Sequence, residues 1–439
     1  MDVEEAFQSI AVLGAAGKMG RGIALLLLQE IAFIDEAVLI LVETNSTCFS
    51  ALKKYLRSQL KKFAERHINA LREKYEVRLD LIDNEQIIEA FVAQAMDRIR
   101  TVISLEECSG ATLIFEAIAE DPEIKGEAFR KLSFIASHEA CYFTNTSSIP
   151  IHVLQEKSAL EKKIIGFHFY NPPFVQQLVE LIIPENSDPA LRELALKIAK
   201  RLKKIVVFSK DVAGFIGNGH FIREISEACQ LVRELEEIMP LTEAIYTVDY
   251  LTREFMLRPM GIFQLIDYVG LDICKRIQEI MTTYLTTGPF TDELIDTMIE
   301  NGAKGGQSSE GMQKDGIFRY VKGQPIEVYD YKTKSYTAAS ADKLGPLPPG
   351  HVSWKSLSRD VERQSKILNY FKNLWEESTL GAELSRRFLA KSRSIAHLLV
   401  DSDIAQSIKD VDIVLQKGFF HLYGVEEPFS SFAIEGKKS

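Results

Sequence analysis

The sequence predicts a doubly wound α/β domain followed by all-α domains, and three observations support this prediction. Short apolar runs alternate with helical patterns over roughly the first 200 residues, which is typical of a parallel sheet covered by helices. The first of these runs ends in a glycine-rich turn that opens a helix. Beyond residue 210 the pattern is mostly helical. We therefore expect an α/β domain at 1–209, a helical domain at 210–321, a linker at 322–352 and a second helical domain at 353–439.

The first apolar run, IAVLG, ends at Gly14 and leads into GKMG and an apolar helix that starts near Lys18 and Met19. The glycines Gly14, Gly17 and Gly20 form the pattern GxxGxxG, in which the middle glycine of the usual GxGxxG fingerprint is displaced. Gly14 suits a tight turn, Gly17 a close approach of the backbone to a pyrophosphate, and Gly20 close packing of helix on strand. The turn taken alone is also compatible with an ordinary strand–helix connection.

The next strand, AVLILVE, ends in Glu43, which stands 23 residues after Gly20. A carboxylate at this place accepts hydrogen bonds from both ribose hydroxyls and repels a 2′-phosphate. Strand, glycine turn, helix, strand and acid together form one βαβ unit of the Rossmann type. The unit predicts NAD rather than NADP as cofactor. The predicted cofactor contacts in this unit are Gly14, Gly17, Lys18, Met19, Gly20 and Glu43.

Further strands are expected in TLIFEAIAED, CYFTNTSSIPI, KKIIGFHFYNPP, QLVELIIP and KKIVVFSK. Residues 45–100 have the pattern of long charged helices, which usually present a solvated face. Their basic positions are an alternative contact for an anionic substrate tail. These positions are Lys53, Lys54, Arg57, Lys61, Lys62 and Arg66. The polar run 144–148 follows a strand, where open α/β sheets bind ligands, although such a run also caps helices.

GFHFYNPPFVQQLVE places His168 twelve residues before Glu180. A histidine works as a base near neutral pH when a carboxylate beside its other nitrogen fixes its tautomer. Pro172 and Pro173 prevent a helix from continuing out of the histidine strand, so the pair must meet through a turn. The alternative is a strand-end histidine satisfied within a core.

The remaining half is helical to about residue 300, and a Gly/Lys/Ser-rich loop then precedes the strand-like IFRYV. Residues 322–352 have the composition of turns and a hairpin. Residues 243–270 resemble residues 407–429, since both run from a helix with an acidic–hydrophobic centre into an aromatic, glycine-containing turn. We interpret the second segment as a repeat of the first.

The formal net charge is 52 − 62 = −10, which argues against nucleic acid as a partner. The five cysteines are dispersed without metal-ligand spacing, as expected of reduced thiols, so no metal is predicted. The amino terminus lacks the basic start of a signal peptide, and the longest apolar run is too short to cross a membrane. Cytoplasm is the expected compartment.

Seven segments resemble, in order, the NAD-dependent 3-hydroxyacyl-CoA dehydrogenase family. They are GAAGKMGRGIA, FEAIAEDPEIK, TNTSSIPI, GFHFYNPP, QLVELI, DVAGFIGNG and RPMGIFQLIDYVGLD. The spacings also agree, with 21 residues from Ser147 to His168 and 50 from His168 to Asn218. The resemblance implies that Ser147, His168, Glu180 and Asn218 are catalytic. It further implies cofactor contacts by Glu120, Lys125, Ser147, Asn171 and Lys314, and coenzyme A contacts by Gln59 and Arg66.

The resemblance implies oxidation of (S)-3-hydroxyacyl-CoA to 3-oxoacyl-CoA in fatty-acid β-oxidation. It also implies a 6-phosphogluconate-dehydrogenase-like helical repeat, here in two copies. The carboxyl-terminal part resembles the dehydrogenase portion of bacterial fatty-acid oxidation proteins, and no hydratase domain is expected. The alternatives are a 3-hydroxybutyryl-CoA or short hydroxy-acid dehydrogenase, or a non-catalytic NAD-binding relative. We expect a monomer rather than a homodimer, with possible docking to other β-oxidation enzymes.

The chain departs from the family pattern in four places. They are the GxxGxxG loop, the insertion IAFIDEA before the second strand, Gly219 where many relatives have arginine, and longer substrate-side helices. We expect these departures to alter chain-length preference or cofactor affinity while leaving the catalytic groups in place.

Overall fold

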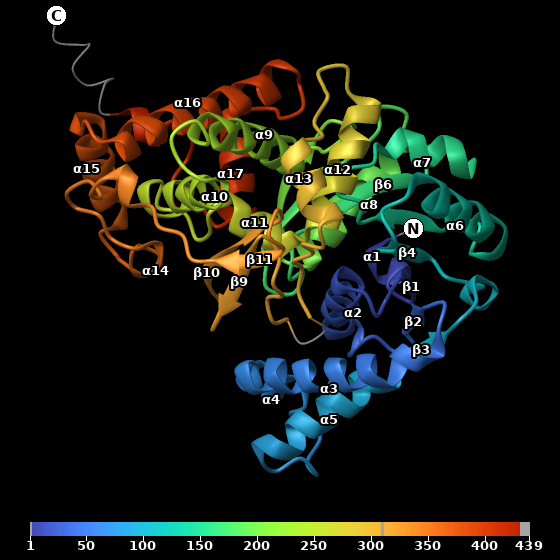
Figure 1. Cartoon of the computed structure of the whole chain (residues 1–439). Coiled ribbons are helices and arrows are strands. Elements are labelled where there is room, and N and C mark those ends of the chain that lie inside the picture. Colours follow the sequence, from blue (N-terminus) through green and yellow to red (C-terminus); the bar gives the residue numbers. More distant parts are fainter. Residues whose placement is uncertain (1, 309–310, 431–439) are drawn as a thin grey trace, which may run out of the picture. The chain divides into compact units, whose positions relative to one another are not determined.

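The computed structural model describes residues 2–308 and 311–430. The end of the predicted second helical domain, 431–439, and two residues of the glycine-rich loop, 309–310, lie outside the described residues. The chain divides into two compact units, Met1–Asp211 and Val212–Ser439 (Figure 1).

The first unit is built on an eight-stranded sheet in the order β3-β2-β1-β4-β5-β6-β7-β8. Neighbouring strands are parallel except for β6 and β7, which are antiparallel. From β3 to β6 this is the order of a dinucleotide-binding sheet, whose direction of winding reverses between β1 and β4. The strands are β1 (Ser9–Leu13), β2 (Val38–Val42), β3 (Ile99–Val102), β4 (Leu113–Glu116), β5 (Cys141–Thr144), β6 (Ile164–Phe169), β7 (Leu178–Ile182) and β8 (Ile205–Ser209).

Eight α-helices accompany this sheet in the described part of the first unit. They are α1 (Val3–Ala6), α2 (Lys18–Ile31), α3 (Phe49–Arg66), α4 (Ile68–Lys74), α5 (Asn84–Asp97), α6 (Pro122–Ile135), α7 (Ile151–Ser158) and α8 (Pro189–Arg201). The apolar residues of α2 are buried on nearly every side, because the helix lies against the sheet and under α3 and α5. Among the described residues no helix combines the length and apolar character that crossing a bilayer requires.

The prediction that residues 45–100 are helical is wrong at its end. The helical stretch is three helices, and it is followed by the edge strand β3, which pairs in parallel with β2. Only Val102 of this strand is buried. A four-residue edge strand therefore lacks the apolar run by which buried strands are recognised.

The second unit is mainly helical (Figure 1). Its helices are α9 (Gly217–Leu235), α10 (Leu241–Tyr250), the π-helical η3 (Leu251–Phe255), α11 (Ile262–Val269), α12 (Leu271–Tyr284), α13 (Glu293–Glu300), α14 (Trp354–Leu357), α15 (Arg363–Glu376), α16 (Leu380–Asp401) and α17 (Ile408–Gly418). A three-stranded antiparallel sheet of β9 (Phe318–Val321), β10 (Gln324–Asp330) and β11 (Ser335–Thr337) contacts α10 through β10. The predicted linker 322–352 therefore contains two of these strands.

The two segments of the predicted repeat share one local structure. In the first, the carboxylate of Asp249 accepts the N–H of Gln264 at 2.8 Å. In the second, the carboxylate of Asp412 accepts the N–H of Val425 at 2.8 Å. Each aspartate also packs on a glycine of the following turn so closely that a Cβ there would lie within 2.5 Å of the carboxyl group. These glycines are Gly261 and Gly424.

Candidate active site

The glycine turn joins β1 to α2 at the carboxyl edge of the sheet. Gly14 has φ +72°, and a Cβ there would lie 2.6 Å from the carbonyl oxygen of Ala117. A Cβ at Gly20 would lie 2.0 Å from the carbonyl oxygen of Gly14. The turn therefore requires both of these glycines for its own packing.

Gly17 differs, because its φ of −63° and ψ of 167° suit any residue, and the nearest contact of an added Cβ is 3.2 Å. Gly17 is the N-cap of α2, and no side-chain hydrogen bond caps the helix there. The absence of a side chain keeps the positive amino end of α2 open, which suits a pyrophosphate. The contact of Gly17, the displaced glycine of the GxxGxxG pattern, with the cofactor stays a prediction.

Glu43 follows β2, and its Oε1 accepts the N–H of Ala16 in the glycine turn at 2.5 Å. The carboxylate therefore lies beside the turn, as its predicted role at the ribose requires. Two further predicted contacts are on α2. Met19 packs partly against the core, and burial together with Arg21 lowers the pKa of Lys18 to about 8.

Glu120 organises the polar run that follows β5. One carboxylate oxygen accepts the N–H groups of Ser147 and Ser148 at 2.9 and 3.1 Å. The same oxygen accepts the hydroxyls of Thr146 and Ser148 at 2.7 and 2.8 Å. Burial opposes ionisation of Glu120, but Lys125 and these hydrogen bonds outweigh it and lower its pKa. Glu120 thus holds the backbone of Ser147 in place.

Lys125 on α6 is 1% exposed. Its Nζ lies 2.6 Å from Oε1 of Glu116 and 3.4 Å from Oε2 of Glu120. Burial opposes its charge, but the two carboxylates outweigh it and raise the pKa of Lys125. The ammonium therefore stabilises the Glu120 carboxylate, and the contact of both side chains with the cofactor stays a prediction.

His168 and Glu180 stand directly opposite each other on the antiparallel strands β6 and β7. Nδ1 of His168 lies 2.9 Å from Oε1 of Glu180, and both side chains are buried. Because an ionised carboxylate only accepts, Nδ1 carries the proton and exchange falls to Nε2. The hydroxyl of Tyr170 donates to the same carboxylate oxygen at 2.8 Å. Burial and the Glu180 charge raise the pKa of Tyr170 well above its usual value.

Ser147 follows β5, and His168 lies near the end of β6, which is the parallel neighbour of β5. Both residues therefore lie at the same edge of the sheet. The side-chain oxygen of Asn145 accepts the N–H of Phe169 at 2.9 Å, which ties the two strand ends together. Asn171 stands two residues further on, in the segment that follows β6.

The predicted substrate positions are on α3, where Gln59 is partly buried and Arg66 is exposed. All six basic positions of this helix are exposed, opposite a buried stripe that includes Leu56 and Leu60. Lys61 pairs with Glu89 of α5 at 3.1 Å. The helix therefore has the solvated cationic face expected from the sequence, and its contact with coenzyme A stays a prediction.

Asn218 and Lys314 belong to the second unit. Asn218 is in the first turn of α9, directly after a turn in which Gly214 and Phe215 have φ values of +83° and +50°. Lys314 lies in the glycine-rich loop, where its N–H donates to the carbonyl of Gly306 at 3.0 Å.

Asp267 on α11 anchors this loop. Its carboxylate accepts the N–H groups of Ile317 and Phe318 at 2.7 and 2.8 Å, and its carbonyl accepts the N–H of Gly306 at 2.7 Å. Burial raises the pKa of Asp267 to about 8, against the opposing effect of these N–H groups. The backbone that carries Lys314 is thus fixed from α11.

Sequence reasoning missed Tyr170 and Asp267, and it placed Asn145 in the polar run 144–148 without its contact to Phe169. Tyr170 is two residues from His168, and the period-two alternation of strands places such residues on one face. The sequence therefore carried a signal that Tyr170 lies beside the histidine. Asp267 binds backbone groups 50 and 51 residues away, for which a local pattern carries no signal. Among the described residues no group of three or more metal-ligating side chains is found, which leaves no candidate metal centre there.

Comparison with known proteins places the two units in one family. Residues 9–212 match the family described as 3-hydroxyacyl-CoA dehydrogenase, NAD binding domain. Residues 214–315 match 3-hydroxyacyl-CoA dehydrogenase, C-terminal domain. A probable 3-hydroxybutyryl-CoA dehydrogenase of Deinococcus radiodurans is 32% identical over 220 residues, which is 50% of this chain and 77% of that protein.

The fatty acid oxidation complex subunit alpha of Vibrio parahaemolyticus is 27% identical over 60% of this chain. The match spans only 38% of that longer protein. The solved 3-hydroxybutyryl-CoA dehydrogenase of Escherichia coli shares the fold with a TM-score of 0.62 and 17% identity, and the match covers 99% of this chain and 96% of that one. The chain therefore belongs to the 3-hydroxyacyl-CoA dehydrogenase family of NAD-dependent oxidoreductases, and its first unit is the family's NAD-binding domain.

Proposed function

We propose that this protein oxidises (S)-3-hydroxyacyl-CoA to 3-oxoacyl-CoA in fatty-acid β-oxidation, with His168 as the general base. The main support is the 2.9 Å contact between Nδ1 of His168 and Oε1 of the buried Glu180. Oxidation of a secondary alcohol needs a base for the hydroxyl proton, and a histidine serves when a second group fixes its tautomer.

The residues present fit NAD at the carboxyl edge of the sheet. Gly17 leaves the amino end of α2 open, and Glu43 lies beside the same turn. NAD, when bound, supplies the acceptor for the hydride that leaves the alcohol carbon. The protein's part is to hold the nicotinamide and the hydroxyl in reacting geometry and to move the proton.

In this proposal Nε2 of His168 takes the hydroxyl proton, and Glu180 stabilises the imidazolium that forms. Tyr170 shares the Glu180 oxygen at 2.8 Å and so keeps that carboxylate turned towards the histidine. Ser147 and Asn218 donate hydrogen bonds to the substrate oxygen as it changes between alkoxide and carbonyl. Such donors contribute roughly 3 kcal/mol each in other enzymes.

The cationic face of α3 supports an acyl-CoA substrate, since the coenzyme A tail carries phosphates. A 3-hydroxybutyryl-CoA dehydrogenase is the second candidate, favoured by the name of the Deinococcus radiodurans relative. Turnover of 3-oxoacyl-CoA substrates of increasing chain length separates the two, because a short-chain enzyme loses activity beyond four carbons.

We also propose that the protein is cytoplasmic and that it is a monomer able to dock to other β-oxidation enzymes. Light scattering tests the monomer, and co-purification tests the docking.

The direct test is the loss of NADH absorbance when purified protein is mixed with acetoacetyl-CoA. We expect turnover by the unmodified protein, and a fall of several orders of magnitude in kcat for His168→Gln. His152→Gln is the matched control, because His152 is an exposed histidine of the same unit that pairs with Asp211 at 2.9 Å. NAD binding without turnover would instead support a non-catalytic relative.

A further inference from the structure

The second unit contains a first helical segment, residues 212–300, and a second helical segment, residues 353–430. The second segment contacts the first turn of α9, which carries Asn218. His220 stands two residues after Asn218 and is 1% exposed. Its Nε2 lies 3.2 Å from the main-chain oxygen of Ser392 on α16. Because a carbonyl oxygen only accepts, Nε2 donates in this contact. The hydroxyl oxygen of Ser392 lies 3.3 Å from the same nitrogen.

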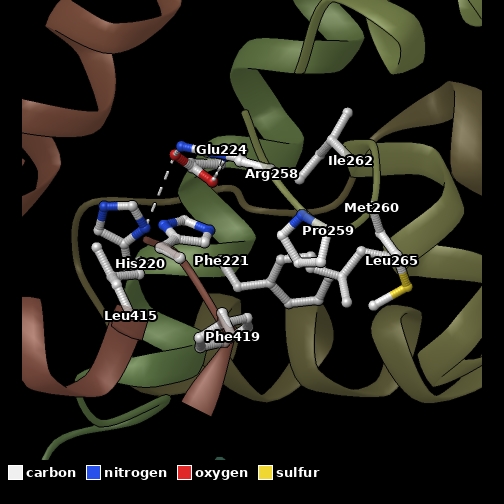
Figure 2. Close-up of a pocket in the computed structure, with 11 residues that line it drawn as sticks. His220, Phe221, Glu224, Arg258, Pro259, Met260, Ile262, Leu265, Leu415 and Phe419 are labelled. Carbon is white, nitrogen blue, oxygen red and sulfur yellow. Dashed lines mark hydrogen bonds and ion pairs between the residues drawn. The ribbon is translucent and has the colours of Figure 1, made fainter. Parts of the chain in front are cut away.

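The other ring nitrogen faces a buried ion pair. Nδ1 lies 3.9 Å from Oε1 of Glu224, as the dashed line in Figure 2 shows. Within the described residues this nitrogen has no hydrogen-bond partner. Arg258 binds both oxygens of Glu224 at 2.8 and 2.9 Å, so the carboxylate is already neutralised. The surroundings therefore favour an uncharged His220, whose remaining hydrogen bond is directed at Ser392.

The ion pair of Glu224 and Arg258 also joins α9 to another part of the first helical segment. Arg258 stands in the turn between η3 and α11, and Glu224 stands on α9. Two buried tyrosines of the second helical segment hold the same turn. The hydroxyl of Tyr423 donates to the carbonyl of Met256 at 2.6 Å, and that of Tyr370 donates to the carbonyl of Phe255 at 2.9 Å.

The start of α9 is held by backbone hydrogen bonds rather than by a side-chain cap. Its N-cap residue is Ile216, which makes no side-chain capping hydrogen bond. The first-turn N–H groups of Gly219 and His220 instead donate to the carbonyls of Gly214 and Ile216 at 2.8 and 2.9 Å. The tertiary contacts of the first two turns add to these local hydrogen bonds in fixing the geometry of the helix start.

We propose that His220 is a positioning residue for Asn218, acting by tying the first turn of α9 to the main chain of α16. This role rests on the proposed function, in which Asn218 donates to the substrate oxygen. The second helical segment is then part of the machinery that aligns the reacting groups. A displacement of about 1 Å at such a group costs up to 100-fold in rate in other enzymes.

The test compares two polar substitutions. The amide nitrogen of glutamine can reach the place of Nε2, whereas asparagine is too short to reach Ser392. We expect His220→Asn to lower kcat about tenfold with the KM for NADH unchanged, and His220→Gln to retain most of kcat. Equal kcat in all three proteins, or equal losses in both variants, would overturn the proposal. If His220→Asn does not fold, His220→Leu replaces it in the same comparison.

Two controls separate positioning from general stability. Trp375→Phe removes a hydrogen bond of 2.7 Å from Nε1 to the carbonyl of Pro428, in the same helical segment but away from α9, and should leave kcat unchanged. In an Asn218→Ala background, His220→Asn should cost no further activity, because its effect passes through Asn218. A full additional loss there would contradict the proposal.

Amide hydrogen exchange gives a readout that needs no turnover. We expect His220→Asn, but not His220→Gln, to speed exchange several-fold in peptides covering residues 214–224. Exchange unchanged by His220→Asn would overturn the positioning role whatever the activity. Absence of any turnover by the unmodified protein would instead refute the proposed function, and the exchange comparison would then decide whether His220 holds α9.

Discussion

His168 and Glu180 are direct cross-strand neighbours, with Nδ1 of the histidine 2.9 Å from Oε1 of the glutamate. The eleven residues between them are the length of one antiparallel connection. Side chains directly opposite each other on one face of a sheet are held at contact distance by the backbone ladder itself. The alignment of this pair is therefore a property of the sheet rather than of a mobile loop.

The charge of Glu180 should matter more than its shape. Glu180→Gln keeps an oxygen that can accept from Nδ1, but it removes the charge that stabilises the imidazolium. We expect kcat to fall about 100-fold, within the range attributed to general acid–base catalysis, while the KM for NADH stays unchanged. Stopped-flow measurement of NADH oxidation with acetoacetyl-CoA tests this, and an undiminished kcat would refute the role given to the carboxylate.

Tyr170 should have a smaller effect, because it acts only by orienting Glu180. Tyr170→Phe removes the hydroxyl that donates at 2.8 Å and leaves the ring in place. We expect a loss in kcat of about threefold to tenfold, equivalent to roughly 1 kcal/mol, the typical net contribution of one hydrogen bond. In a Glu180→Gln background, Tyr170→Phe should lower kcat little further. Fully additive losses in kcat would show that Tyr170 acts on another group.

Substitutions in the glycine turn distinguish a glycine that packing requires from a glycine that leaves space for the cofactor. Gly20→Ala would place a Cβ 2.0 Å from the Gly14 carbonyl oxygen, so we expect loss of folded protein. Gly17→Ala meets its nearest neighbour at 3.2 Å, so we expect a folded protein with weaker NADH binding. Circular dichroism and NADH fluorescence titration distinguish these outcomes, and normal NADH affinity in Gly17→Ala would contradict the pyrophosphate role of the turn.

Glu43 should govern the choice between NAD and NADP. Glu43→Gln removes the charge that repels a 2′-phosphate and keeps an oxygen to accept the Ala16 N–H, which it now holds at 2.5 Å. We expect the preference of kcat/KM for NADH over NADPH to fall about tenfold or more. Steady-state kinetics with both cofactors measure this ratio, and an unchanged ratio would mean that another group sets the selectivity.

The sequence predicted those parts of the fold whose signals are local. The glycine turn, the buried apolar strands and the spacing of His168 and Glu180 are short-range patterns with a direct physical meaning. The edge strand β3 gave no such pattern, because only Val102 of its residues is buried. Asp267 and the Ser392–His220 contact also lacked a signal, since their partners are 50 and 172 residues away in the chain. Contacts of that kind follow from tertiary packing, which no local period encodes.

Acid should destabilise the second unit through His220. Burial, with Arg258 and Arg223 adding to it, lowers the pKa of His220 below its usual 6.5, although Glu224 and the Ser392 carbonyl oppose the shift. Nearby His421, which also lines the cavity around His220, has its pKa lowered by burial as well. The unfolded chain therefore binds protons at a pH where the folded unit does not.

The stability contributed by the neutral histidine is then fully present above about pH 6.5 and is lost as the pH falls through the lowered pKa. We expect the contribution of each histidine to the free energy of unfolding to decrease below pH 6.5 by at most about 1.4 kcal/mol per pH unit. The raised pKa of Asp267 acts in the opposite direction, but equally in the unmodified protein and in a His220 variant. Urea unfolding between pH 5 and 7.5 measures the slope. His220→Gln should reduce it and leave the part due to His421, because glutamine does not titrate in this range. An identical slope in both proteins would show that the pKa of His220 is the same in the folded and the unfolded protein, which would contradict the lowered pKa.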